Sequence, residues 1–285
     1  MDKEIKKLIQ HTVIEPKKLL HLNFGELWKY RDLISLFVKK DFALVYKQTI
    51  LGPLWVFLNP LITTIIYTVV FGGIANISTD GVPKLLFYMA GNTLWTFFSE
   101  AISKTATTFK DNAQVFGKIY FPRLTRPISL VLYTGINFAF QFLMFVPVWI
   151  FYIVRGEVQP HWTYLWVLPV VLLFMAAMAL GCGLIVSSIT IKYRDMAIVI
   201  TFGVKVWMYA TPVVYPMTEV NNELLRRIIL LNPVTQPMEL FRFVLLGEGT
   251  LSAAGMIWTA VFAVAILLFG MMYFNKVEKT FMDTI

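Results

Sequence analysis

Residue types that commonly carry catalysis or bind metals are sparse in this chain, and their spacing fits no enzyme or metal site. Cys182 is the one cysteine, so an internal disulfide is excluded. A phosphate-binding GxxxxGK[ST] loop is missing, because Gly117-Lys118 is followed by Ile119 and lacks the upstream glycine. The histidines show neither the HExxH nor the Cys/His spacing of a metal site; they are His11, His21 and His161. We therefore expect no catalytic residue, no metal and no cofactor in this chain.

Polar side chains inside long apolar stretches are stronger candidates, because a charge in hydrocarbon is costly and generally faces a cavity or a partner. Lys205 lies in the middle of one such stretch, where it could face a lumen or pair with a carboxylate on another helix. Glu100 and Lys104 are spaced i,i+4, which favours a structural ion pair. Asn137 and Gln141 share one helix face, and their pattern favours hydrogen bonds between helices over substrate contacts.

Aromatic residues make up 15% of the chain, and those within apolar stretches form a second candidate set. Trp and Tyr at the ends of such stretches are typical of membrane interfaces. Rings near the middle, beside threonines and asparagines, could stack on sugar rings or could simply pack between helices. The side chains that could line a translocation path are Tyr67, Trp95, Phe98, Lys205, Trp207 and Tyr209.

The composition requires elements that lie in a membrane. Of the 285 residues, 58% are hydrophobic and 15% are charged, whereas an average soluble domain carries about 25% charged residues. Several apolar runs also reach the roughly 20 residues needed to cross a bilayer. We predict an all-α polytopic membrane protein whose domain 54–274 has six transmembrane helices. These are expected at 54–75, 84–106, 128–154, 163–190, 197–215 and 252–274.

Lysine and arginine set the expected orientation, because they concentrate in cytoplasmic segments. Placing the N-terminus inside puts eighteen of the 25 on the cytoplasmic side and five on the other. Both the segment 1–53 and the tail 275–285 are therefore expected in the cytoplasm. Since the formal charge of +8 follows from this topology, nucleic acid is not an expected partner. The first fifty residues are mixed in charge, so no cleavable signal peptide is expected.

An amphipathic helix is predicted at about 32–46, directly before the first span. Its apolar residues cover half of a helical wheel, which is typical of a helix lying in the membrane interface. Asp41 falls inside the apolar arc. We favour a break in the helix at which Asp41 caps a second helix, over a straight helix in which Asp41 meets a cation.

The loop 107–127 is expected inside. Asp111 or Asn112 can cap a short helix there and Gly117 can end it. This helix could be a docking element, or the segment could be an ordinary loop between helices.

A helical hairpin is expected outside, at 217–250. Its two apolar halves are too short to span and are separated by Asn232-Pro233, which is typical of a re-entrant or interfacial hairpin. Two acid–base pairs in it have the spacing of surface ion pairs; they are Glu223 with Arg227 and Glu239 with Arg242.

These segments together resemble the permeases of ABC transporters that export polysaccharides and glycoconjugates, such as capsule, O-antigen and teichoic-acid exporters of the type-2 class. Six motifs carry the resemblance in chain order. They are KDFALVYKQTILGPLWVFLNPLI (40–62), GKIYFPRLTRPIS (117–129), KYRDM (192–196), YATPVVYP (209–216), NP (232–233) and RFVLLG (242–247). Val45 departs from the family, which often has a basic residue there.

The resemblance implies a multi-pass protein of a bacterial inner membrane that forms a homodimer with two copies of a separate ATP-binding subunit. That subunit would bind ATP and Mg²⁺. The substrate would be a lipid-linked glycan whose anionic head group is attracted, beside membrane lipid, by Lys39, Lys40 and Lys47. The loop 107–127 would hold a coupling helix on the ATPase, and its contact residues would be Asn112, Gln114, Val115, Phe116, Lys118, Tyr120 and Arg123.

Three other function classes stay open. A secondary transporter or channel would need no ATPase subunit, but Lys205 alone is thin support for it. A membrane-embedded glycan enzyme should cluster acidic residues or histidines at one membrane face, whereas those here are scattered. A type-2 ABC exporter of a drug or a lipid would share the topology.

Overall fold

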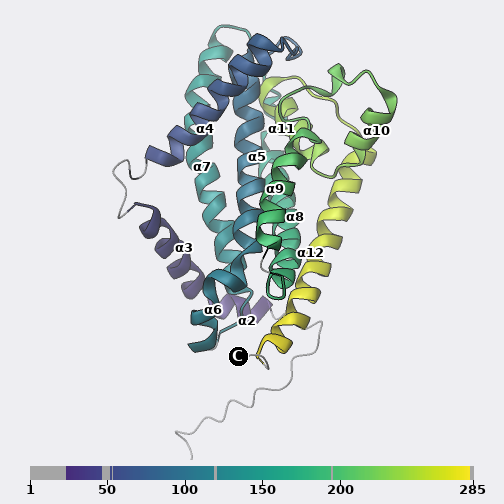
Figure 1. Ribbon diagram of the computed structural model, residues 1–285. Helices are drawn as coiled ribbons and strands as arrows, with labels where there is room; N and C mark the ends of the chain where they lie inside the picture. The colour runs from purple at the N-terminus through teal and green to yellow at the C-terminus, as the bar shows by residue number, and fades with distance from the viewer. Residues whose placement is uncertain (1–23, 47–51, 53, 119–120, 194, 283–285) are drawn as a thin grey trace, which may run out of the picture.

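The computed structural model describes residues 24–46, 52, 54–118, 121–193 and 195–282, and this part of the chain contains helices and no strands (Figure 1). The elements are α2 (Phe24–Lys29), α3 (Arg31–Tyr46), α4 (Leu54–Tyr67) continued by the π-helical η1 (Thr68–Ile74), α5 (Lys84–Ala106), α6 (Thr108–Lys118), α7 (Thr125–Val154), the 3₁₀ turn η2 (Trp162–Val167), α8 (Leu168–Thr190), α9 (Met196–Tyr209), the 3₁₀ turn η3 (Met217–Glu219), α10 (Glu223–Leu231), α11 (Thr235–Leu246) and α12 (Ala253–Met282).

Four helical segments of the described chain are long and apolar enough to cross a membrane: Leu54–Ile74, Thr125–Val154, Trp162–Thr190 and Ala253–Val277. Two of the six predicted spans are absent from this set. The 23-residue α5 is about 35 Å long but carries two lysines and a glutamate. The predicted span 197–215 is only a 14-residue helix, α9, because the chain turns after Tyr209 at a segment with two prolines.

Helix α5 is the central helix of the bundle and packs against α4, α7, α8 and α9 (Figure 1). Leu86, Phe98 and Ala101 on α5 are fully buried. Beside it, α8 and α12 lie in close contact along their length. A Cβ atom on Gly181 would lie 2.6 Å from the carbonyl oxygen of Ile266, so glycine is required for this approach.

Helices α2, α3 and α6 and the end of α12 lie together at the lower end of the bundle in Figure 1. Helix α3 runs unbroken through Asp41, so the favoured break there is wrong. Asp41 instead meets a cation, Arg126 of α7, at 2.6 Å, and the pairing lets a carboxylate sit on the inner face of a continuous helix.

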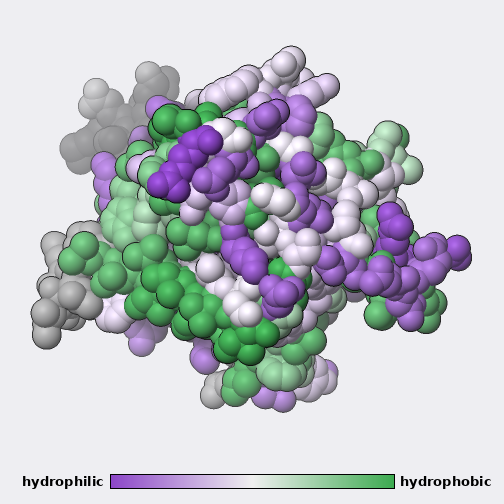
Figure 2. All heavy atoms as spheres, turned by 90° about the horizontal axis from the view of Figure 1, so that it is seen from above, coloured by the Kyte–Doolittle hydropathy of each residue, from purple (hydrophilic) through white to green (hydrophobic). Residues whose placement is uncertain are grey.

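Helices α10 and α11 cover the opposite end and differ sharply in exposure. Figure 2 shows this end, with hydrophilic residues across its middle and at its right edge, where α10 projects. Glu223 and Arg227 on α10 form the expected exposed pair at 3.1 Å. Glu239 and Arg242 on α11 were expected on the surface, but both side chains are buried, because α11 packs against α5 and α8.

Arg242 holds the turn after α9 onto the bundle. Its guanidinium donates to the carbonyl oxygens of Pro212 and Val213, at 2.5 and 2.6 Å, and lies 3.8 Å from the ring centre of Phe87. Burial raises the pKa of the Glu239 carboxyl and lowers the pKa of Arg242 to about 10. At neutral pH Arg242 therefore stays charged despite complete burial.

Candidate functional site

Arg126 joins three helices at the end of the bundle that carries α6. From α7 it donates two hydrogen bonds to the Asp41 carboxylate on α3, at 2.6 and 2.9 Å. Its Nε also donates to Oδ1 of Asn112 on α6, at 3.0 Å. The guanidinium lies over the ring of Phe37, 5.3 Å from its centre. A bidentate, largely buried Arg–Asp pair is among the stronger polar contacts in proteins, so Arg126 ties α3 firmly to α7 and bonds α6 as well.

Asn112 also sets the shape of α6. The helix is kinked at this residue, whose backbone has φ −119° and ψ 15°. Its side-chain amide donates back to the carbonyl oxygen of Thr108 at 2.9 Å. Asn112 therefore lies at the junction of two helical turns, and its side-chain oxygen accepts from Arg126.

The predicted coupling residues divide between a buried and an exposed face of this segment. Asn112, Phe116 and Arg123 are buried, and the Arg123 guanidinium lies 5.6 Å from the ring centre of Phe116. Gln114 is exposed and Val115 is half-buried. Tyr120 lies outside the described residues, as does the side chain of Lys118. Of the residues expected to bind the lipid head group, Lys39 and Lys40 are exposed on α3, and Lys47 lies outside the described residues.

The side chains expected to line a translocation path are likewise divided between the core and the surface. Trp95 and Phe98 pack against each other inside the core, with 5% and 0% of their surface exposed. Trp207 is half-buried, and its indole N–H donates to Oδ1 of Asn232 at 3.2 Å. The exposed members are Lys205 and Tyr209 on α9.

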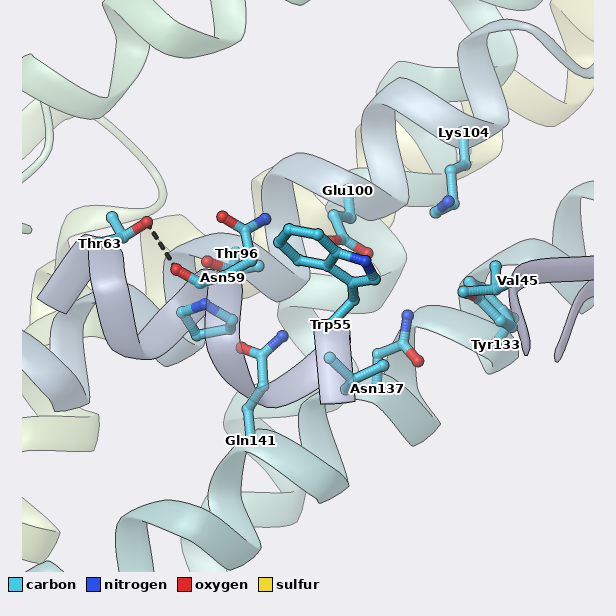
Figure 3. Close-up of a pocket in the computed structure, with 12 residues that line it drawn as sticks. Val45, Trp55, Asn59, Thr63, Thr96, Glu100, Lys104, Tyr133, Asn137 and Gln141 are labelled. Carbon is cyan, nitrogen blue, oxygen red and sulfur yellow. Dashed lines mark hydrogen bonds between the residues drawn. The ribbon is translucent and has the colours of Figure 1, made fainter. Parts of the chain in front are cut away.

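A cavity of about 230 Å³ lies between α4, α5 and α7, beside the end of α3 (Figure 3). Each of the three helices contributes polar or aromatic side chains at i, i+4 and i+8, which places them on one face of that helix. We call this space the polar cavity. Its stripes are Trp55, Asn59 and Thr63 on α4; Thr96, Glu100 and Lys104 on α5; and Tyr133, Asn137 and Gln141 on α7.

Two expectations about these stripes need revision. Glu100 and Lys104 form no ion pair with each other; the Lys104 ammonium lies 5.1 Å from the ring centre of Tyr133. Asn137 and Gln141 were expected to bond between helices, yet Asn137 Oδ1 and Gln141 Oε1 are buried and have no hydrogen-bond partner in the described chain. The sequence does contain a signal for this cavity that was not recognised, namely polar or aromatic residues at i, i+4 and i+8 on each of three helices.

A second cavity of about 230 Å³ adjoins the polar cavity and shares Val45, Lys104 and Tyr133 with it. Its other lining residues include Asp41, Asn112 and Arg126. The two cavities therefore lie side by side, one at the three-helix junction at Arg126 and the other between α4, α5 and α7. No group of three or more His, Cys, Asp or Glu side chains that could hold a metal ion occurs in the described part of the chain.

Comparison with known proteins gives one family and a consistent set of relatives. A family model described as ABC-2 type transporter matches residues 32–246. An O-antigen export system permease protein RfbA from Myxococcus xanthus is 26% identical over 262 residues, which is 91% of this chain and 98% of that protein. A protein of the same description from Klebsiella pneumoniae is 26% identical over 261 residues, covering 92% and 96% of the two chains.

Proposed function

This chain belongs to the ABC-2 type transporter family, and we propose that it is the permease subunit of an ATP-driven exporter of lipid-linked glycans. The substrate would be an O-antigen, capsule or teichoic-acid type of polymer, carried from the cytoplasmic side across a bacterial inner membrane. The observation that supports this substrate class best is the similarity to O-antigen export permeases over more than nine-tenths of the chain.

In this proposal the permease works as a homodimer with six spans in each copy and both termini in the cytoplasm. Helices α5 and α9 would be the two spans that length and composition alone do not identify. Helix α9 exposes large apolar side chains on one face, among them Ile198, Phe202 and Val206. The segment Leu54–Ile74, which comprises α4 and η1, exposes a similar face. Only 11% of its most apolar 18-residue stretch is buried within one copy. Such faces need lipid or a second copy against them.

Helix α6 would dock on a separate ATP-binding subunit, which holds ATP and Mg²⁺. Its exposed side, at Gln114, would contact that subunit. Its buried side would pass the movement to α7 and α3 through Asn112, Arg126 and Asp41. The α3 helix, with Lys39 and Lys40 exposed, would then change its position against the anionic lipid head group at the inner interface.

The proposal is tested by isolating the complex. The tagged chain, expressed together with its neighbouring genes, should retain an ATP-binding protein through purification in detergent. Replacing Gln114 and Val115 by alanine should weaken that association, while the same change at exposed Arg226 and Arg227 on α10 should not. A permease that purifies without any ATP-binding protein, under conditions where both are expressed, would contradict the proposed coupling.

A further inference from the structure

The polar cavity contains two buried side-chain oxygens that no described residue hydrogen-bonds. Asn137 and Gln141 are 7% and 4% exposed, and the carbonyl oxygen of each side chain has no partner among the described residues. Figure 3 shows both amides pointing from α7 into the space around Trp55. Buried polar groups are nearly always hydrogen-bonded, because an unpaired one retains its desolvation penalty. Two such groups aimed into one cavity indicate a polar ligand.

The charges in the cavity indicate that this ligand is neutral. Glu100 and Lys104 supply one carboxylate and one ammonium, and both extend from α5 toward α7 (Figure 3). Phosphate sites instead bring several cations or an arginine fork to one point. No described arginine lines the polar cavity; Arg126 lines the adjoining one, and its fork is occupied by Asp41. A group with both donors and acceptors and no net charge satisfies these side chains best.

The size of the cavity and its remaining lining groups further restrict the chemical class of the ligand. Trp55 offers a flat indole that is 48% exposed, next to the amides and hydroxyls of the three stripes. A sugar ring combines an apolar face, which packs on an aromatic ring, with hydroxyls at its edge that bond amides and carboxylates. The volume of about 230 Å³ is below the roughly 300–1,000 Å³ of pockets for drug-sized ligands. It suits one ring and not an extended chain.

We propose that the polar cavity is a binding site for a single neutral sugar ring attached to a membrane lipid. The inference rests on the proposed function in one respect, namely that this ring belongs to the exported lipid-linked glycan. The adjoining cavity leads from the polar cavity to the junction of α3, α6 and α7. A bound sugar would therefore lie next to the residues that connect the coupling helix to the interface helix.

The test uses the full chain in phospholipid nanodiscs and alkyl glycosides with a photoreactive diazirine in the alkyl chain. The head groups are glucose, galactose, mannose and N-acetylglucosamine, and the comparison probe carries phosphocholine on the same chain. Light-induced labelling is mapped by mass spectrometry of peptides, and affinity is measured by competition with the unlabelled glycoside. At least one glycoside should label the facing stripes of α4, α5 or α7 in a saturable manner, and the phosphocholine probe should not.

Gln141→Leu and Asn137→Leu should each weaken the competition by about tenfold, the effect of losing one hydrogen bond. Both variants should unfold at the same or a higher temperature than the unchanged chain without glycoside, because each removes a buried side-chain oxygen that has no partner in the described chain. The control is Thr134→Val on the same helix, whose hydroxyl bonds the carbonyl oxygen of Val131 outside the cavity. This variant should bind the glycosides as the unchanged chain does.

The proposal is overturned if no glycoside labels the cavity saturably, if the phosphocholine probe labels it equally well, or if neither leucine variant changes the affinity. Failure of the proposed function looks different. In that case glycosides still label the cavity, but cells lacking this chain export their glycans normally. Export that depends on the chain and its ATPase, together with an unlabelled cavity, would remove the sugar site alone.

Discussion

At the scale of single residues, Arg126 is the side chain through which α6, the proposed coupling helix, would act on α3, the proposed interface helix. Replacing it by leucine leaves Asp41 without its cation and Asn112 Oδ1 without its donor. Breaking a buried ion pair in this way typically costs about 3–5 kcal/mol. We expect Arg126→Leu to lower the unfolding temperature and to abolish export while ATP hydrolysis by the complex continues.

Arg126→Lys separates charge from geometry in the same experiment. Lysine keeps the positive charge but cannot bond the carboxylate with two parallel N–H groups. We expect folding close to normal and export per ATP hydrolysed clearly reduced. The matched control is Arg155→Lys, because Arg155 is exposed and its contacts, with Glu157 at 3.8 Å and with the ring of Phe151, join no other helix. Normal export per ATP in Arg126→Lys would show that charge alone suffices at this position.

Alanine variants of Trp95 and Tyr209 distinguish a role in packing from a role in transport. Trp95 is buried, so Trp95→Ala should destabilise the fold by about 3–5 kcal/mol through the cavity that it creates. Tyr209 is 58% exposed, so Tyr209→Ala should change stability by less than about 0.5 kcal/mol and yet slow export. Thermal unfolding and export measured on both variants distinguish the two roles. A Tyr209→Ala variant with full export would remove this residue from the path.

Residue types alone singled out candidate side chains but did not predict how those side chains pair. Asp41, Glu100, Lys104, Asn137 and Gln141 all stood out because polar groups are rare in apolar helices. Asp41 and Lys104 contact side chains on another helix, and the oxygens of Asn137 and Gln141 have no partner in the described chain. One sequence contains no record of such tertiary neighbours. The Arg126–Asp41 pair joins residues 85 positions apart, so no local spacing could reveal it.

At the scale of elements, α6 has one side that holds it in place and one side that is free to contact a partner. Phe109 and Phe116 are buried, and their rings contact each other. Phe116→Ala should therefore loosen the helix and lower stability by about 3 kcal/mol or more. Gln114→Ala should leave stability unchanged but reduce ATPase binding and export. A loss of export without any change in ATPase binding would contradict the docking role.

The two acid–base pairs of the α10–α11 hairpin show how burial changes the contribution of an ion pair to stability, because one pair is exposed and the other is buried. Arg242→Leu removes a buried cation and leaves Glu239 unpaired, at a cost of about 3–5 kcal/mol. Arg227→Leu breaks only the exposed pair with Glu223, which is worth about 0.3–0.5 kcal/mol. Thermal unfolding of the two variants in nanodiscs should differ accordingly. Equal unfolding temperatures would show that α11 is not anchored through Arg242.

The approximate positions of most long helices followed from the apolar runs, but how deeply each helix is buried in the bundle did not. The predicted segment 84–106 coincides closely with α5, Lys84–Ala106. Its polar residues face neighbouring helices, which explains why α5 is central although it is less apolar than α7 or α8. Nothing in the local pattern of the hairpin showed that α11 is buried and α10 exposed, because both helices carry similar apolar and charged residues.

At the scale of the whole molecule, one copy of the chain leaves several of the described helices largely uncovered, α4 and α9 among them. Exposed apolar residues include Ile66 on α4, Val69 on η1, and Ile198 and Phe202 on α9. The composition predicted such surfaces, since 58% hydrophobic residues exceed what a single bundle can bury. The sequence could not predict which helices would carry them, because that depends on how the bundle packs. The six-span topology and the homodimer remain proposals that these surfaces support.

The central claim is that this permease moves a lipid-linked glycan only when an ATP-binding subunit works on it. The most direct measurement is transport into proteoliposomes that contain the chain together with its co-purified ATPase and a fluorescent lipid-linked oligosaccharide. We expect protected substrate to accumulate with ATP and Mg²⁺, and to fall to background without ATP, without the ATPase or with Arg126→Leu in the permease. Equal accumulation with and without ATP, or none in the complete system, would contradict the account.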